Sequence, residues 1–129
     1  MYHFDTPSPL PALTSPALEI VLAYFSAPLS RSLESSVPSA YQKFFDASEG
    51  ATNELQAHAS GWVVEDVEHE RILGKGEKGK LFVGLFGWES VEGHLSYRAT
   101  KTFQENIQGV RKSGHEGVEM FHVLLKQLK

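Results

Sequence analysis

The segment "ESVEGHLSYRATKTF" (residues 89–103) carries a histidine, a tyrosine and an arginine at positions 94, 97 and 98. A histidine titrates near neutral pH, so it can act as a general acid or base. A tyrosine hydroxyl can donate a hydrogen bond to a carbonyl or enolate oxygen, and an arginine can bind an oxyanion. His94, Tyr97 and Arg98 are therefore candidates for proton transfer and oxyanion binding. The alternative for each of them is a place on a solvated helix surface.

A second candidate base, His122, lies in the apolar segment "VEMFHVLLKQL" (residues 118–128). Alternation along a strand puts its side chain on the same face as Met120 and Leu124. If that face borders a ligand cavity, His122 is the best general base of the chain, and otherwise it is a hydrogen-bonded core residue. Apolar walls for a ligand could come from three more aromatic residues, with core packing as the alternative: Tyr24, Trp62 and Trp88.

The elements that must position these residues follow a simple order. β-branched and aromatic residues predict a strand over 17–25. A helix is expected to begin near Val37-Pro38, behind a cap at Ser35 or Ser36. The remaining predicted elements are a second helical piece over 52–59, strands over 61–73 and 80–88, a helix over 90–110 and a strand over 118–128.

The order β-α-β-β-α-β is typical of an α+β, ferredoxin-like fold, an antiparallel sheet with helices on one face. Ser90 is the expected N-cap of the helix over 90–110. One stripe of this helix should face the sheet, and it consists of Val91, Leu95, Ala99, Thr102 and Asn106. His94 and Arg98 would then lie at the border of that stripe, where a pocket between helix and sheet would begin.

Bulk composition suits one domain, predicted over residues 17–129, behind an extended arm over 1–16 that holds four of the six prolines. The formal charge of −4 leaves no basic field for a phosphate backbone, so no nucleic-acid partner is expected. The apolar runs are too short to span a bilayer, and no signal peptide is recognisable, so we expect no membrane association and a cytoplasmic location.

The sequence contains no complete motif for binding a metal ion or a phosphate group. The loop "GKGEKGK" (residues 74–80) imitates a phosphate-binding loop, but a strand pattern follows it where a helix is required. The chain has no cysteine, and its six histidines lack compact ligand spacing. We therefore expect no metal and no cofactor.

The stretch from Trp88 to Phe103 resembles the dimeric α+β barrel superfamily. This superfamily includes antibiotic-biosynthesis monooxygenases, haem-degrading monooxygenases, stress-response A/B barrel proteins and small polyketide cyclases. The resemblance implies a homodimer with a small-molecule pocket in each subunit. Trp88 matches the aromatic residue that ends the third strand in that family. Tyr97 falls where monooxygenase members carry histidine and cyclases carry tyrosine. Phe103 replaces the catalytic histidine of those cyclases, which is a departure from their design.

Three functions follow from this reading. The first is a cyclase or isomerase for a polyketide-like or other hydrophobic carbonyl substrate, with His122 or His94 as base and Tyr97 as acid. In that reading the substrate also contacts Trp88, Arg98 and Phe103. The second is a cofactor-free monooxygenase of the same superfamily. The third is a non-catalytic dimer that carries a ligand or serves a stress response.

Overall fold

The computed structural model describes residues 16–52 and 54–124. The predicted arm over 1–16 lies outside the described residues except for Pro16, as do residues 125–128 of the predicted last strand. The sheet is antiparallel in the order β2-β4-β1-β5, and β3 pairs with the outer part of β4. Its strands are β1 (Ala17–Ser26), β2 (Leu55–Trp62), β3 (Val67–Glu68), β4 (Lys78–Trp88) and β5 (Gly117–Leu124). This topology confirms the predicted α+β, ferredoxin-like fold.

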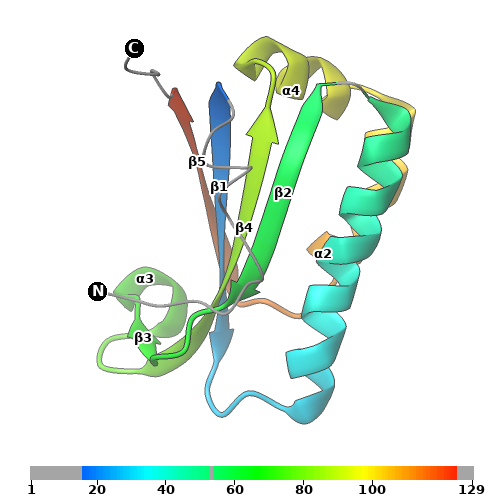
Figure 1. The fold of residues 1–129 in the computed structure, drawn as a ribbon. Coiled ribbons are helices and arrows are strands. Elements are labelled where there is room, and N and C mark those ends of the chain that lie inside the picture. Colours follow the sequence, from blue (N-terminus) through cyan, green and yellow to red (C-terminus); the bar gives the residue numbers. More distant parts are fainter. Residues whose placement is uncertain (1–15, 53, 125–129) are drawn as a thin grey trace.

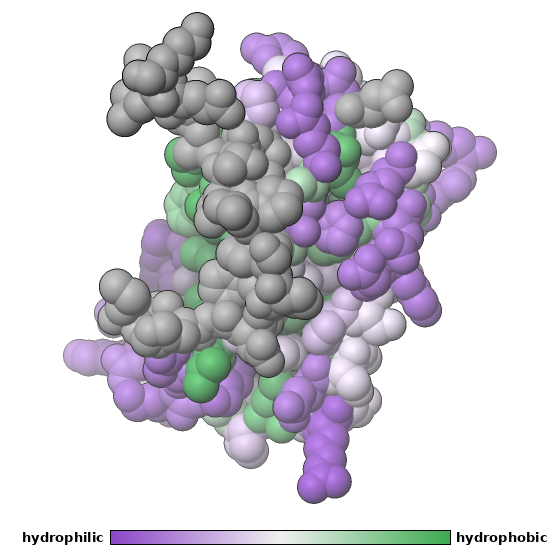
Figure 2. Space-filling model, viewed as in Figure 1, coloured by the Kyte–Doolittle hydropathy of each residue, from purple (hydrophilic) through white to green (hydrophobic). Residues whose placement is uncertain are grey.

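The long helix α2 (Arg31–Ala51) runs along the sheet, as Figure 1 shows. Shorter helices complete the fold, namely α3 (Glu70–Leu73), α4 (Val91–Arg98), α5 (Lys101–Asn106) and α6 (Gln108–Arg111). The outer side of α2 is hydrophilic in the space-filling view, and hydrophobic side chains show beside the strands (Figure 2). One apolar cluster joins the inner side of α2 to the sheet through Phe44, Phe45, Phe82 and Phe86. A separate cluster occupies the opposite face of the sheet.

The start of α2 differs from the prediction. The helix begins at Arg31, capped by the Ser30 hydroxyl, which accepts a hydrogen bond from the backbone N–H of Leu33 at 3.1 Å. Pro38 therefore lies inside the helix, where it cannot donate to the carbonyl of Glu34. The indole N–H of Trp62 donates to that carbonyl instead, at 3.0 Å. A partner from the sheet thus satisfies the acceptor that a proline leaves open, and the helix continues.

The region after α2 was also predicted wrongly. The helical piece expected over 52–59 is the beginning of strand β2, whose inward positions are small or apolar and pair with β4. The strand expected over 61–73 is divided into the end of β2, the two-residue β3 and helix α3. The His69 ring caps α3 by accepting from the backbone N–H of Ile72 at 3.2 Å, a local bond that the strand pattern does not reveal.

The single helix predicted over 90–110 is three helices, and its expected inward stripe is wrong. Leu95, expected to face the sheet, is 51% exposed, whereas the neighbouring His94 and Tyr97 are buried. The break follows from Thr100, whose hydroxyl donates to the carbonyl of Tyr97 and accepts from the N–H of Phe103. The expected N-cap at Ser90 is confirmed, since its hydroxyl accepts from the N–H of Gly93 at 2.9 Å.

The face of the sheet opposite α2 carries apolar side chains along its full width. Leu18 and Leu85 are buried there, and Ile20 and Leu22 are half-buried. Phe121 on the edge strand β5 is 48% exposed. Within residues 16–52 and 54–124, no helix is both long and apolar enough to cross a membrane.

Candidate functional site

A cavity of about 250 Å³ lies on the helix-covered face of the sheet, against α2, α4, α5 and α6. Four residues singled out from the sequence line it, namely Trp88, His94, Arg98 and Phe103. Most of the other lining side chains are apolar: Val21, Phe44, Phe86, Ile107, Val110, Val118 and Met120. Drug-sized ligands occupy pockets of about 300–1,000 Å³, so this cavity suits a smaller molecule.

Glu19 is the one carboxyl group on the cavity wall, and it is only 5% exposed. It points to the helix side of β1 because residues 17, 21 and 23 of the same strand also face the core of that side. The indole N–H of Trp88 donates to its Oε1 at 3.1 Å. Burial raises the pKa of Glu19 to about 7, against the opposing effects of the Trp88 hydrogen bond and the charge of Arg98. A carboxyl group with such a pKa is suited to proton transfer at neutral pH.

His94 is 2% exposed and stacks on Trp88, with ring centroids 4.4 Å apart. Its Nε2 lies 3.4 Å from Oε1 of Glu19, and its Nδ1 lies 2.7 Å from Nε2 of His122. Burial, with the charges of His122 and Arg98, lowers the pKa of His94 to about 4. A neutral imidazole at pH 7 is therefore held between the buried carboxyl group and a second imidazole. The solvated surface position considered for His94 is wrong.

His122 on β5 lies directly opposite Glu19 on β1 in the register of the two strands. It is exposed, and it is not part of the cavity lining. The three groups lie in a row that begins with Glu19 at the cavity, continues through the buried His94 at 3.4 Å and ends with His122 at the surface, to which His94 is hydrogen-bonded. Such a row of titratable groups can pass protons between the buried carboxyl group and solvent.

Tyr41 presents a second polar group to the cavity. Its side chain is 1% exposed, and its hydroxyl has no hydrogen-bond partner among the described residues. Its ring lies close over Gly84 of β4, where an added Cβ would meet the Tyr41 ring at 3.3 Å. Burial, followed by the charge of Glu19, raises the pKa of Tyr41. The hydroxyl therefore stays protonated at neutral pH and remains available as a donor to a bound ligand.

Tyr97 does not line this cavity. Its ring lies behind the lining residues Trp88 and Phe103, and its hydroxyl donates to the Ser48 hydroxyl at 2.9 Å in a buried contact. The hydrogen-bond donor that the sequence analysis assigned to the reaction is thus used in packing α4 against α2. Tyr41 offers a hydroxyl that has no partner within residues 16–52 and 54–124.

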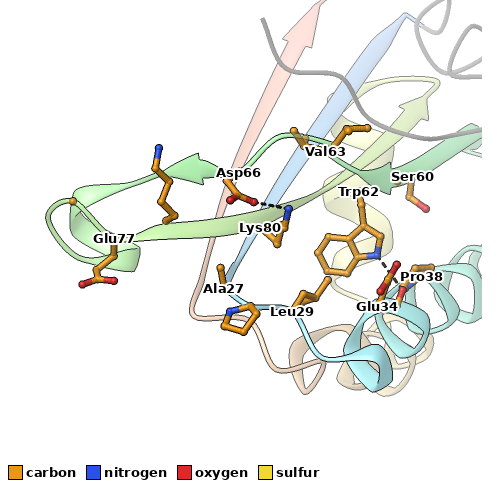
Figure 3. A pocket seen from close by; sticks show the side chains of 15 residues that line it. Ala27, Leu29, Glu34, Pro38, Ser60, Trp62, Val63, Asp66, Glu77 and Lys80 are labelled. Atoms are coloured by element: carbon orange, nitrogen blue, oxygen red, sulfur yellow. Dashed lines mark hydrogen bonds and ion pairs between the residues drawn. The ribbon is translucent and has the colours of Figure 1, made fainter.

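The two remaining candidates lie elsewhere. Tyr24 is on the opposite face of the sheet, where its hydroxyl donates to Glu119 at 3.0 Å. Trp62 lines a second, wider cavity of about 1010 Å³ beside the start of α2 and the β3–β4 hairpin. Figure 3 shows its indole directed at the carbonyl of Glu34, and an ion pair between Lys80 and Asp66 nearby. The structure brings neither residue to the cavity of His94.

Glu19, His94 and His122 are also the groups that could hold a metal ion, because their donor atoms lie within 4.8 Å of one another. Two imidazoles and a carboxylate are a donor set that transition metals accept. Two nitrogen ligands on one zinc ion lie roughly 3.3 Å apart, since each Zn–N bond is about 2.0–2.1 Å. The imidazole nitrogens of His94 and His122 are 2.7 Å apart, which is a hydrogen bond. The two rings as they stand are therefore spaced for a hydrogen bond, and an ion would have to separate them.

Four polar residues that line the cavity were not predicted from the sequence, namely Glu19, Tyr41, Arg111 and His115. A signal for Glu19 exists, because it is the only charged residue in the apolar strand "ALEIVLAYF". A charge at a core-facing position of such a strand needs a partner or a function. Tyr41 carries no comparable signal, because a tyrosine on the apolar stripe of a helix is a usual core residue.

The comparisons with known proteins agree with the fold. No family model matches the sequence, and no curated protein matches it. Among solved structures, a dimeric ferredoxin-like protein of unknown function from Thermobifida fusca superposes with a TM-score of 0.56 at 13% identity, covering 87% of this chain and 93% of its own. SnoaB, a cofactor-independent oxygenase from Streptomyces nogalater, gives 0.53 at 9% identity, covering 88% and 97%. Hydroxynitrile lyase from Passiflora edulis gives 0.50 at 11% identity, covering 88% and 95%. The chain therefore has the ferredoxin-like fold found in dimeric α+β barrel proteins, as the sequence resemblance predicted.

Proposed function

We propose that this protein is an enzyme that transfers protons next to a carbonyl group of a small hydrophobic substrate, using its own side chains. The observation that carries this proposal is that the Glu19 carboxyl group and the unpartnered Tyr41 hydroxyl both line one apolar cavity. A base for a carbon acid and a donor for the carbonyl oxygen are the two groups that enolisation requires. The solved structures of the same fold include enzymes that act on small molecules, which supports a catalytic role.

In the proposed reaction, the Glu19 carboxylate removes a proton from the carbon next to the carbonyl group. The electron pair of the broken C–H bond forms an enolate, whose oxygen accepts the hydrogen bond of Tyr41. In an isomerisation, protonated Glu19 returns the proton to another carbon of the substrate. In a cyclisation, the enolate carbon bonds to a second carbonyl carbon of the same molecule, and protonated Glu19 protonates the new alkoxide. His94 and His122 exchange the proton of Glu19 with solvent between turnovers.

We favour the cyclase or isomerase reading because it needs only groups that the cavity contains. A cofactor-free monooxygenase is the second candidate, since the same carbanion can react with oxygen. It is favoured by the apolar wall of Trp88, Phe44 and Phe86 and by the likeness to SnoaB. Oxygen consumption during turnover separates the two. We expect neither reaction to need a metal, and elemental analysis of the purified protein together with activity after chelation checks this.

A homodimer formed through the sheet face opposite α2 is part of the proposal. That face carries exposed or half-buried apolar side chains on neighbouring strands, including Phe121, Val123, Ile20 and Leu22. Burial of such a face removes apolar area from water and covers the edge strand β5. The likeness to dimeric proteins of the same fold supports this arrangement.

The test of the proposed function needs no knowledge of the native substrate. A panel of one-ring aryl ketones and β-keto esters is incubated in D₂O, and deuterium incorporation next to the carbonyl is followed by NMR. Purified protein should accelerate the exchange for some panel members over a control with heat-denatured protein. If no member exchanges faster in the presence of the protein, the proposed proton transfer does not occur in this cavity.

A further inference from the structure

Two arginines line the cavity. Arg98 lies near the end of α4 and Arg111 at the end of α6. Neither guanidinium forms an ion pair with a carboxylate of residues 16–52 or 54–124. This is unexpected in a chain with 16 acidic and 12 basic residues, because an excess of carboxylates makes pairing easy. An unpaired arginine beside a cavity leaves its planar donors free for a ligand.

The interior of the cavity also offers hydrogen-bond donors, which favours a ligand that accepts hydrogen bonds. The Tyr41 hydroxyl has no partner among the described residues, and its side chain is nine-tenths buried or more. The charge of Arg98 acts on both Glu19 and His94, so its guanidinium lies on the same side of the cavity as the proton-transfer groups. Among residues 16–52 and 54–124, Glu19 is the only carboxyl group that lines the cavity, and burial raises its pKa to about 7. The other polar side chains of the lining are Tyr41, His94, Arg98, Arg111 and His115, so the lining is richer in hydrogen-bond donors than in negative charge.

We infer that the ligand of this cavity is an anion, a small hydrophobic carbonyl compound whose carboxylate is bound by Arg98 while its carbonyl oxygen accepts from Tyr41. The carbonyl half of this inference rests on the proposed function, and the anion half does not. The guanidinium of Arg98 lies 6.0 Å from the centroid of the Phe103 ring, which orients it at the cavity wall. Arg111 is exposed and increases the local concentration of anions at the entrance.

A ligand with these features is a one-ring oxo acid or a molecule of similar size. The cavity of about 250 Å³ limits the ligand to a single ring or a short chain. Proton removal from such a ligand adds a second negative charge at the enolate oxygen. Arg98 and Tyr41 lie on the wall where both charges would be, so the same lining that binds the anion also favours the transition state.

The experiment compares phenylacetate with phenylacetamide, which has the same shape but no charge and an NH₂ group in place of one oxygen, in tag-free full-length protein at low salt. Binding is followed by NMR chemical-shift changes or calorimetry. The unmodified protein should bind phenylacetate about 10-fold or more tightly than phenylacetamide, because a buried charge pair is lost with the amide. Arg98→Gln should abolish this preference, and Arg98→Lys should keep part of it. Lys112→Gln removes an exposed charge beside Arg111 that does not line the cavity, and it should change nothing.

Equal affinity for the two probes, or no saturable binding of phenylacetate at millimolar concentration, overturns the inference. The inference is also overturned if the Arg98→Gln protein still prefers phenylacetate while its melting temperature is unchanged. The proposed function is judged separately by deuterium exchange. Exchange catalysis without carboxylate preference refutes only the anion site. Carboxylate preference that depends on Arg98, without exchange catalysis, leaves the anion site standing and refutes the proton transfer.

Discussion

The Nδ1 of His94 lies 2.7 Å from the Nε2 of His122, so an imidazole that is buried against the cavity is in direct hydrogen-bond contact with one that is exposed at the surface. The two residues are 28 positions apart, on helix α4 and strand β5. Their contact connects Glu19, which water hardly reaches, with the solvent. In the proposed reaction Glu19 returns its proton to the substrate within each turnover, so this connection serves the exchange of that proton with solvent.

The first prediction concerns this connection. His122→Ala should slow the catalysed deuterium exchange between substrate and solvent, while substrate binding stays nearly unchanged, because His122 does not line the cavity. Loss of a group that assists proton transfer typically costs on the order of 100-fold. Isomerisation or cyclisation should be affected much less, because Glu19 returns its proton to the substrate. Added imidazole should restore part of the exchange rate by replacing the missing ring, and the readout is the rate of deuterium exchange with and without imidazole.

His58→Gln is the matched control for that experiment, because His58 lies on β2 outside the cavity and pairs with Glu49. It should keep the full rate of deuterium exchange. A His122→Ala protein with unchanged deuterium exchange and no response to imidazole would show that protons leave Glu19 by another route.

The second prediction compares two buried tyrosines on the helix-covered side of the sheet. Tyr41→Phe removes a hydroxyl without a partner among the described residues, so the variant should be as stable as the parent or more stable. Its turnover should fall on the order of 100-fold or more, as for the loss of one oxyanion donor. Tyr97→Phe removes the bond to Ser48, so it should lower the free energy of unfolding by about 1 kcal/mol and leave turnover nearly unchanged.

Turnover and urea unfolding of both variants check this pair. The opposite pattern, with activity lost in Tyr97→Phe and stability lost in Tyr41→Phe, would return the acid role to Tyr97 as the sequence resemblance suggested. The pair is informative because both substitutions delete the same atom from a ring that is almost completely buried.

The third prediction follows from the pKa values of Glu19 and His94. The pKa of Glu19 rises from 4.5 in the unfolded chain to about 7, so the folded protein binds more protons and its stability falls as pH increases from about 4.5 to 7. The pKa of His94 falls from 6.5 to about 4, so this group makes stability fall as pH decreases over the range from about 6.5 to 4. The two effects oppose each other in the unmodified protein.

Glu19→Gln removes only the first effect. The stability of the variant relative to the parent should therefore increase between pH 5 and pH 7.5, by on the order of 1–3 kcal/mol. Urea unfolding at several pH values measures the difference. A difference that does not change with pH would mean that Glu19 ionises in the folded protein as it does in the unfolded chain.

The fourth prediction concerns assembly. Light scattering at micromolar concentration should give twice the chain mass of 14.3 kDa. Phe121→Lys places a charge on the exposed part of the sheet face opposite α2 and should shift the protein toward the monomer. Leu95→Lys, at an equally exposed apolar residue on α4, is the control and should leave the assembly unchanged. A monomeric parent protein would remove the dimer from the proposal.

The fold was largely predictable from the sequence because its signals are local or periodic. The apolar strands over 17–25 and 80–88 and the Ser90 cap were recognised from the residues themselves. Errors arose where a tertiary contact decides the outcome. Pro38 suggests a helix start, and only the Trp62 indole explains why the helix continues through it.

The site was only partly predictable for the same reason. Trp88, His94, Arg98 and Phe103 come from one continuous segment, so the resemblance of that segment was enough to bring them together. The contact of His94 with Glu19 and His122 depends on the register of β1 with β5 and on the break of the helix after Arg98. Neither the register nor the break can be read from the spacing of residues along the chain.

The most direct test of the proposed proton transfer is the deuterium exchange rate of a substrate-like ketone in Glu19→Gln beside Glu92→Gln. The amide introduced by Glu19→Gln keeps an acceptor for the Trp88 indole and lacks only the basic carboxylate, whereas Glu92 is an exposed carboxylate on α4 outside the cavity. Glu19→Gln should reduce the catalysed exchange by on the order of 100-fold or more, with a melting temperature no lower than that of the parent protein. Glu92→Gln should exchange at the same rate as the parent protein. Full exchange activity in a correctly folded Glu19→Gln protein would contradict the role of Glu19 as the base.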